Sequence, residues 1–170
     1  MKKILSFSLA TIFLVGINAL AYGAPAEMAT GGGVTVPYLN MQDHIQFDAH
    51  ETSPDGNLGK GSVSYSRLGQ FTYQFDVKYA RVVPEEHVAW FAGQVTESST
   101  GENLGRWMSF AVCDEDSEKC ATDMQGYQWI PDTNMSAEEQ EAIALEWVQQ
   151  GLPDPYTSGL PVVEGNITVH

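Results

Sequence analysis

The sequence contains one dense group of side chains that could bind a metal ion. Carboxylates stand at Asp114, Asp116 and Glu118, and another follows at Asp123. Oxygen ligands on a short loop are those that calcium prefers. An EF-hand would require a glycine at the sixth position and a glutamate at the twelfth, and this segment has neither. The pattern leaves two interpretations open, a calcium site or a solvated acidic turn, and it indicates no other cofactor.

The two cysteines, Cys113 and Cys120, enclose most of this segment. In an exported chain an even number of cysteines predicts a disulfide. A disulfide across so short a loop stabilises a fold by roughly 2–3 kcal/mol in the chain-entropy model. A catalytic or metal-binding thiol pair is the alternative, but the sequence has no C-x-x-C motif to support it.

A second group of possible ligands lies on one predicted strand. His44, Asp48 and His50 share a face when the chain is extended. A strand rises about 3.3 Å per residue, so the two histidines lie roughly 20 Å apart and cannot bind one ion. Asp48 and His50 alone could share an ion with help from other strands, and an exposed polar face is the alternative.

Patterns for catalysis are weak, and we assign no catalytic residue. The segment 56–62 resembles a phosphate-binding loop, but Gly61 follows Lys60 where the motif requires Ser or Thr. The sequence has no G-x-S-x-G motif, and a disulfide would leave no free thiol. Glu86 and His87 are adjacent, so on a strand their side chains would point to opposite faces.

Large aromatic residues are candidates for a ligand- or partner-binding surface. Tyr73, Tyr79, Trp90 and Trp107 could line a cavity in a cup-like barrel of eight strands. Trp90 and Trp107 lie on strand faces opposite to the main apolar stripes, so they could also contact a helix or form an exposed patch. Filling of the core is the alternative for all four residues.

The elements that position these residues are mostly strands, because apolar residues recur at every second position. The clearest run has Phe71, Tyr73, Phe75, Val77 and Tyr79 on one face. This run is long for one strand, so it predicts a bulge or a bend. The same alternation predicts strands over 44–50, 61–66, 87–96, 106–114 and 166–170.

One helix interrupts the strands. Ser136 and Glu139 form a capping box, and Gly151 and Pro153 follow the expected end. The apolar stripe between them predicts an amphipathic helix over about 137–150, packed across a barrel mouth or a sheet edge.

These elements predict a mainly β fold, a single antiparallel β-barrel or sandwich of about 6–8 strands with one C-terminal amphipathic helix. The folded domain is expected over 41–170. Residues 22–40 are rich in Ala, Pro, Gly and Thr, with Gly31–Gly33 at the centre, and are expected to form a flexible linker.

Residues 1–21 predict export as a signal peptide. Lys2 and Lys3 precede an apolar stretch, and Ala19 and Ala21 are the small residues that a signal peptidase requires. Cleavage after Ala21 is expected, with cleavage after Ala26 and an uncleaved anchor as the alternatives. The mature protein would work in the periplasm or outside the cell, with no stable membrane insertion.

The chain is strongly acidic. Its formal net charge is −14, and it becomes −16 without residues 1–21, which carry two lysines and no acidic residue. Such a surface repels phosphate backbones, so nucleic acid is excluded as a partner. The expected partner is an unknown protein or a small ligand.

Four short motifs stand out along the chain: Asp55-Gly56, Gly59-Lys60-Gly61, Val88–Gly93 and Gly165–His170. They resemble those of an uncharacterised group of small exported bacterial β-barrel-like proteins, with a glycine-rich hairpin, an A-x-x-x-G-like strand and a C-terminal GN-x-x-VH strand. The resemblance covers about residues 44–114 and the last six, and it has no counterpart for the helix-bearing segment of about 124–160. It implies a fold and a compartment but no catalytic residue, because the group has no assigned activity.

Three functions are consistent with these features. We favour a non-enzymatic exported domain that binds a partner or ligand, or has a structural role in the envelope. A small secreted hydrolase or isomerase with an unrecognised site and a calcium-dependent binding module are the alternatives. A filled barrel interior would argue against a carrier of small molecules.

Overall fold

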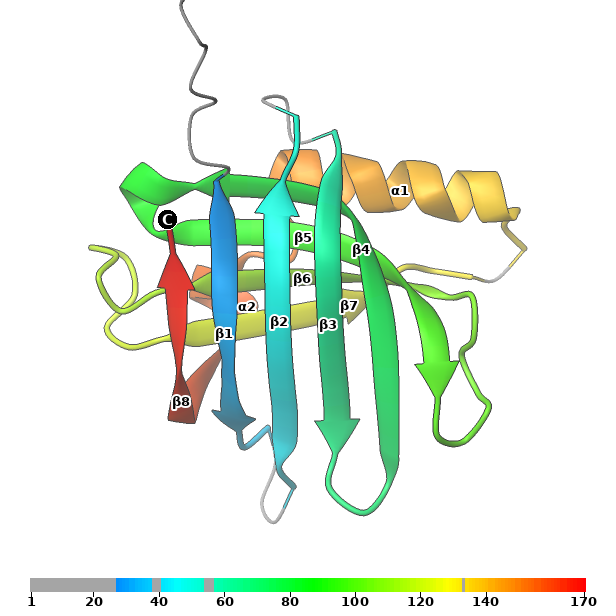
Figure 1. Cartoon of the computed structure of the whole chain (residues 1–170), viewed down its shortest axis with the longest axis horizontal. Coiled ribbons are helices and arrows are strands. Elements are labelled where there is room, and N and C mark those ends of the chain that lie inside the picture. The colour runs from blue at the N-terminus through cyan, green and yellow to red at the C-terminus, as the bar shows by residue number, and fades with distance from the viewer. Residues whose placement is uncertain (1–26, 38–40, 54–56, 133) are drawn as a thin grey trace, which may run out of the picture.

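The computed structural model describes residues 27–37, 41–53, 57–132 and 134–170, and these form a closed antiparallel β-barrel. Each strand pairs with the next along the chain, and β1 pairs with β8 to close the barrel (Figure 1). The strands are β1 (Met28–Thr35), β2 (Asp43–Glu51), β3 (Gly59–Arg67), β4 (Phe71–Val83), β5 (Val88–Ser98), β6 (Trp107–Cys113), β7 (Met124–Trp129) and β8 (Leu160–Val169). The helices are η1 (Pro84–Glu86), α1 (Ala137–Gln150) and α2 (Pro155–Ser158). The prediction of a mainly β barrel with a C-terminal helix is confirmed.

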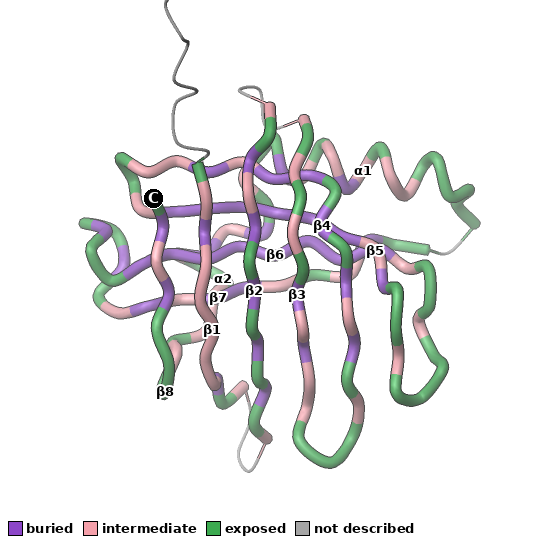
Figure 2. The backbone as a smooth tube through the Cα atoms, in the orientation of Figure 1, coloured by how far each residue is buried: buried purple, intermediate pink, exposed green. Residues whose placement is uncertain are grey.

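Side chains alternate between the inside and the outside of the barrel, as the period of two predicts. On β2, Ile45 and Phe47 are each 4% exposed, whereas His44, Gln46 and Asp48 are exposed. Figure 2 shows buried and exposed residues alternating along this strand. Inside, the ring of Phe91 stacks on that of Phe110 with centroids 5.5 Å apart, and it contacts Phe47 at 5.3 Å. The barrel interior is therefore a packed aromatic core in this region.

The long strand β4 carries the predicted irregularity. Its register against β5 shifts between Val77 and Tyr79. After this shift Ala80 and Val82 belong to the interior cluster, and Tyr79 belongs to a second cluster outside the wall. The expectation that Tyr79 shares the inner face with Phe75 and Val77 is wrong, because the bulge reverses which face each residue occupies.

Helix α1 covers the outer wall of the barrel along β4, β5 and β6 (Figure 1). The Ser136 side chain accepts the Glu139 N–H and the Glu139 side chain accepts the Ser136 N–H, so the predicted capping box is confirmed. The helix ends at Gly151, whose φ of 75° is left-handed. Its position across a barrel mouth or sheet edge is a wrong expectation. The helix buries Ala144 and Val148 against the wall because β5 and β6 are apolar on both faces.

The expected linker over 22–40 is wrong where it overlaps β1. This strand runs from Met28 and pairs with both β2 and β8, so the domain begins before residue 41. A Cβ at Gly31 would lie 2.2 Å from the carbonyl oxygen of Asn166, and one at Gly33 would lie 2.3 Å from Val162 Cγ1. Glycine is needed here because the strands approach closely. Residues 1–26, which include the predicted signal peptide, lie outside the described residues.

Strand β7 was not predicted and lies at the start of the helix-bearing segment of about 124–160, and β8 begins six residues before the predicted strand. The inward residues of β7 include Gln125 and Tyr127, whose polar atoms obscure the apolar alternation. No helix in the described part of the chain is long and apolar enough to cross a membrane.

Candidate functional site

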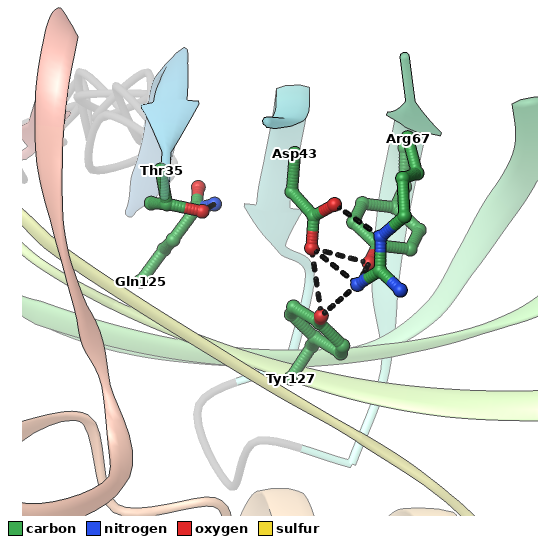
Figure 3. A network of polar contacts seen from close by, with 6 residues as sticks. Thr35, Asp43, Arg67, Gln125 and Tyr127 are labelled. Atoms are coloured by element: carbon green, nitrogen blue, oxygen red, sulfur yellow. Dashed lines mark hydrogen bonds and ion pairs between the residues drawn. The ribbon is translucent and has the colours of Figure 1, made fainter. Parts of the chain in front are cut away.

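Asp43, at the start of β2, is a fully buried carboxylate at one end of the barrel. Arg67, at the end of β3, donates from Nε to Oδ1 at 2.7 Å and from Nη2 to Oδ2 at 2.8 Å. The hydroxyls of Tyr65 and Tyr127 each donate to Oδ2 at 2.9 Å (Figure 3). The carboxylate therefore has four donors from two strands, a geometry that fixes its position and its charge.

The electrostatics of this network keep Asp43 ionised. Burial alone would raise the pKa of its carboxyl group, but the hydrogen bonds from Arg67, Tyr127 and Tyr65 outweigh burial and hold this pKa below its usual range. Burial and the charge of Asp43 raise the pKa of both tyrosine hydroxyls, which remain protonated donors. A carboxylate in this state is poorly suited to act as a general acid.

This network was not predicted, although the sequence carries a signal for it. Asp43 is in phase with the inward residues Ile45 and Phe47, and Arg67 is in phase with Val63 and Tyr65. Two opposite charges in phase with the apolar faces of adjacent strands are expected to meet inside the barrel, since isolated buried charges are costly.

A second buried polar contact lies beside the network. Gln125 Nε2 on β7 donates to Thr35 Oγ1 on β1 at 3.2 Å (Figure 3). Gln125 is 1% exposed, and its Oε1 has no hydrogen-bond partner among the described residues. Gln125 pairs with Leu160 of β8 and Thr35 pairs with Val162 of β8, so this side-chain contact links β7 to β1 across the first residues of β8.

Two of the four predicted calcium ligands, Asp114 and Asp123, accept hydrogen bonds from backbone N–H groups. Asp123 accepts from the backbone N–H of Glu115 at 2.9 Å and from that of Ile167 at 2.7 Å. Asp114 accepts from the N–H of Asp116 at 3.1 Å and from that of Val169 at 3.3 Å. The carboxylates at the two ends of this loop thus fasten it to itself and to β8.

Within the described part of the chain, only two of the predicted metal ligands come together, and a histidine joins them. Ligand atoms of His87, Asp114 and Asp116 all lie within 4.8 Å of one another. Asp123 belongs to the separate hydrogen-bond set described above, and Glu118 is exposed. An imidazole among the ligands suits transition metals better than calcium. Because Asp114 already accepts two backbone N–H groups, the cluster has a structural explanation.

The predicted disulfide is present. Cys113 and Cys120 are bonded with their Cα atoms 6.4 Å apart. Both half-cystines are buried as members of the second apolar cluster. The bond closes the acidic loop at the end of β6, where Asp114 begins its contacts with β8.

The four aromatic residues that were candidates for a binding surface are all buried in the protein. Tyr73 is in the barrel core, with its hydroxyl accepting from Asn103 Nδ2 at 2.8 Å. The other three lie beneath α1, where Trp107 stacks on Tyr79 at 5.8 Å and Trp90 Nε1 donates to the Pro153 carbonyl at 3.1 Å. None of the four is more than 7% exposed, so they form neither an exposed patch nor the wall of an open cavity.

An open site lies on the outer wall instead. A shallow groove of about 850 Å³ crosses β8, β1, β2 and β3. It is lined by Thr30–Val34, His44–Asp48, Ser64, Ser66 and Glu164. Gly32 pairs with Gln46 on one side and Asn166 on the other, so the centre of the groove has no side chain. Local sequence patterns do not predict this groove, because it depends on the pairing of β1 with β8.

Most polar groups in the groove are free to contact a ligand. Asp48 is paired with His50 at 2.6 Å, and Ser64 Oγ accepts from Gln74 Nε2 at 3.2 Å. The other polar side chains of the lining make no hydrogen bond or ion pair with described residues; they are Thr30, His44, Gln46, Ser66 and Glu164. The two predicted strand ligands, Asp48 and His50, are therefore partners of each other.

No family model, curated protein or solved structure matches this chain.

Proposed function

We propose that the chain is an exported, non-enzymatic binding domain whose ligand docks on the outer wall of the barrel. The observation that carries the proposal is the packed interior. Phe75, Phe91 and Phe110 are at most 1% exposed, and the ring centroid of Phe110 lies 5.3 Å from that of Phe75 and 5.5 Å from that of Phe91. A barrel filled in this way has no room beside these rings for the small molecule that a cup-like carrier would hold.

The ionisable groups also argue against an enzyme. Among the described residues, Asp43 and Glu141 both have a pKa below the usual range. Burial opposes this shift at Asp43 but is outweighed by its hydrogen bonds, and the hydrogen bond from Lys78 lowers the pKa of Glu141. Catalytic acids require the opposite shift. These carboxylates serve as acceptors within the fold.

Export is supported by the sequence of residues 1–21 and by the disulfide between Cys113 and Cys120. Disulfides persist in oxidising compartments and are rare in the cytosol. The acidic surface fits a protein of the periplasm or medium, because a net charge far from zero keeps such chains dispersed.

The proposal is tested on the full chain expressed in a bacterial host and purified from the periplasm. Its mass should correspond to a chain beginning at Tyr22 and lacking two hydrogens for the disulfide. The dye 8-anilinonaphthalene-1-sulfonate should show no saturable fluorescence increase at neutral pH, and chromogenic ester, phosphate and glycoside substrates should not be turned over. Saturable dye binding to the native protein would indicate an open interior and would contradict docking on the wall alone.

A further inference from the structure

We infer that the groove on the outer wall binds an uncharged, polyhydroxylated ligand such as the sugar units of a glycan. This inference rests on the proposed function and adds the chemical class of the ligand. The lining offers several kinds of polar group: the hydroxyl of Ser66, the amide of Gln46, the imidazole of His44 and the carboxylate of Glu164.

The shape of the groove suits an extended ligand. It crosses three interstrand steps from β8 to β3, which corresponds to about 14 Å. Along β1 it runs from Thr30 to Val34, roughly 13 Å at the rise of a strand. Gly32 at its centre lets a ligand approach the backbone without meeting a side chain.

Hydrogen-bonding capacity selects the class of ligand. Glu164 can only accept, whereas the amide of Gln46 and the hydroxyls of Thr30 and Ser66 both donate and accept. A sugar hydroxyl also donates and accepts, so neighbouring hydroxyls can satisfy both kinds of group. An apolar ligand would remove water from these groups without replacing their hydrogen bonds, at a cost in free energy.

Charge excludes anions and disfavours cations. The lining contains Asp48 and Glu164 and no lysine or arginine, so phosphate and sulfate groups are repelled. A basic peptide is the strongest competitor. It is disfavoured because the two carboxylates do not form one cation site: Asp48 lies beside Thr30 and Glu164 beside Val34, at opposite ends of the stretch of β1 that lines the groove.

Aromatic stacking contributes little in this groove. Phe47 lines it but is 4% exposed and faces the core. Binding must therefore rest on hydrogen bonds between the ligand and the protein. Each of these replaces hydrogen bonds that both partners make to water, so its net contribution to the binding free energy is small. Weak binding, with a Kd on the order of 1 mM, is expected. The experiment must detect binding in that range.

The test uses the ¹⁵N-labelled exported protein with its disulfide intact. Amide spectra are recorded with neutral gluco-, galacto-, manno- and N-acetylglucosamine oligosaccharides, with pentalysine and with inorganic phosphate. At least one saccharide should give saturable shifts at amides of residues 31–33, 44–48 and 64–66. Phosphate should give none.

A double variant and a matched control locate the site. Gln46→Ala with Ser66→Ala should weaken saccharide binding at least tenfold, because both side chains face the groove and make no hydrogen bond to other described residues. Thr168→Ala, on β8 outside the groove lining, should leave binding unchanged.

The outcomes separate this inference from the proposed function. Binding of pentalysine alone at these amides, or no binding across the saccharide panel, would overturn the glycan assignment and leave wall docking standing. Saccharide shifts confined to interior residues such as Phe75 and Phe91 would overturn both.

Discussion

The side-chain carboxylate of Asp123 accepts the backbone N–H of Ile167 at 2.7 Å, so an acidic side chain takes the place of a strand partner for β8. β7 pairs with β8 only at Met124 and Gln125. Beyond that point Asp123 and Asp114 receive the N–H groups of Ile167 and Val169. The acidic loop therefore completes the barrel between β6 and β8.

Asp123→Ala should destabilise the protein by about 1–3 kcal/mol, because it leaves the buried N–H of Ile167 without an acceptor. Urea unfolding of the disulfide-bonded protein measures the change, and hydrogen exchange should show faster exchange at Ile167. Glu118→Ala is the matched control, since Glu118 is exposed on the same loop. Equal stability of the two variants would show that the contact does not support β8.

The strands and helix that were predicted share a clear local pattern. The capping box at Ser136 and Glu139 and the left-handed Gly151 define α1 without reference to the rest of the chain. The alternation of aromatic and polar residues defines β4, although its bulge reverses the face of Tyr79. A bulge can be expected from strand length, but its position depends on the register with β5.

The elements that were missed depend on long-range pairing. Gly31–Gly33 reads as a linker locally, yet these residues form a strand because β2 and β8 lie so close on either side. The outer groove depends on the same pairing, because β1 forms its centre between β2 and β8. The burial of Asp43 was predictable from the sequence, because its phase on β2 places it among inward residues.

Asp43→Asn should destabilise the protein by about 3 kcal/mol, because it breaks a buried ion pair and leaves the charge of Arg67 without its partner. This is the lower end of the usual range, since the Arg67 side chain retains 20% exposure. Glu86→Gln, which breaks the exposed pair with Lys119, should cost less than about 1 kcal/mol. Chemical denaturation measures both changes. Similar costs would mean that the buried network adds little stability.

The stability of the protein should fall in acid partly through Asp43. Its pKa is lower in the folded protein than the value of about 3.9 in an unfolded chain, because hydrogen bonds from Arg67 and the tyrosines outweigh burial. This contribution is present at neutral pH and is lost as the pH falls below about 4 toward the folded-state pKa. Thermal melts from pH 6 to pH 2 should fall less steeply for Asp43→Asn than for the wild type. Parallel curves would contradict this role.

The loss of protein stability at alkaline pH should depend on Tyr65, whose pKa is raised by burial and by its neighbours Tyr127 and Asp43. A raised pKa in the folded state means that stabilisation is complete below about pH 10 and is lost as the pH rises above it. Tyr65→Phe is expected to be less stable at neutral pH, because Asp43 loses a donor, but to lose less stability between pH 9 and pH 11. Denaturant midpoints at each pH measure the difference. If the midpoint falls equally steeply with pH in the variant and the wild type, Tyr65 does not control the loss of stability at alkaline pH.

Calcium should leave the melting temperature unchanged, because the carboxylates of Asp114 and Asp123 already accept backbone N–H groups and Glu118 is exposed. A ligand that binds only the folded state must stabilise it, by about 2.7 kcal/mol at one hundred times its Kd. Differential scanning fluorimetry with up to several millimolar calcium, compared with EDTA and with magnesium, makes the measurement. A calcium-specific rise that Asp116→Asn abolishes would show that the acidic loop is a metal site as well as a structural element. Since Asp116 contributes only its backbone N–H to the hydrogen bonds of this loop, that variant separates metal binding from the contacts with β8.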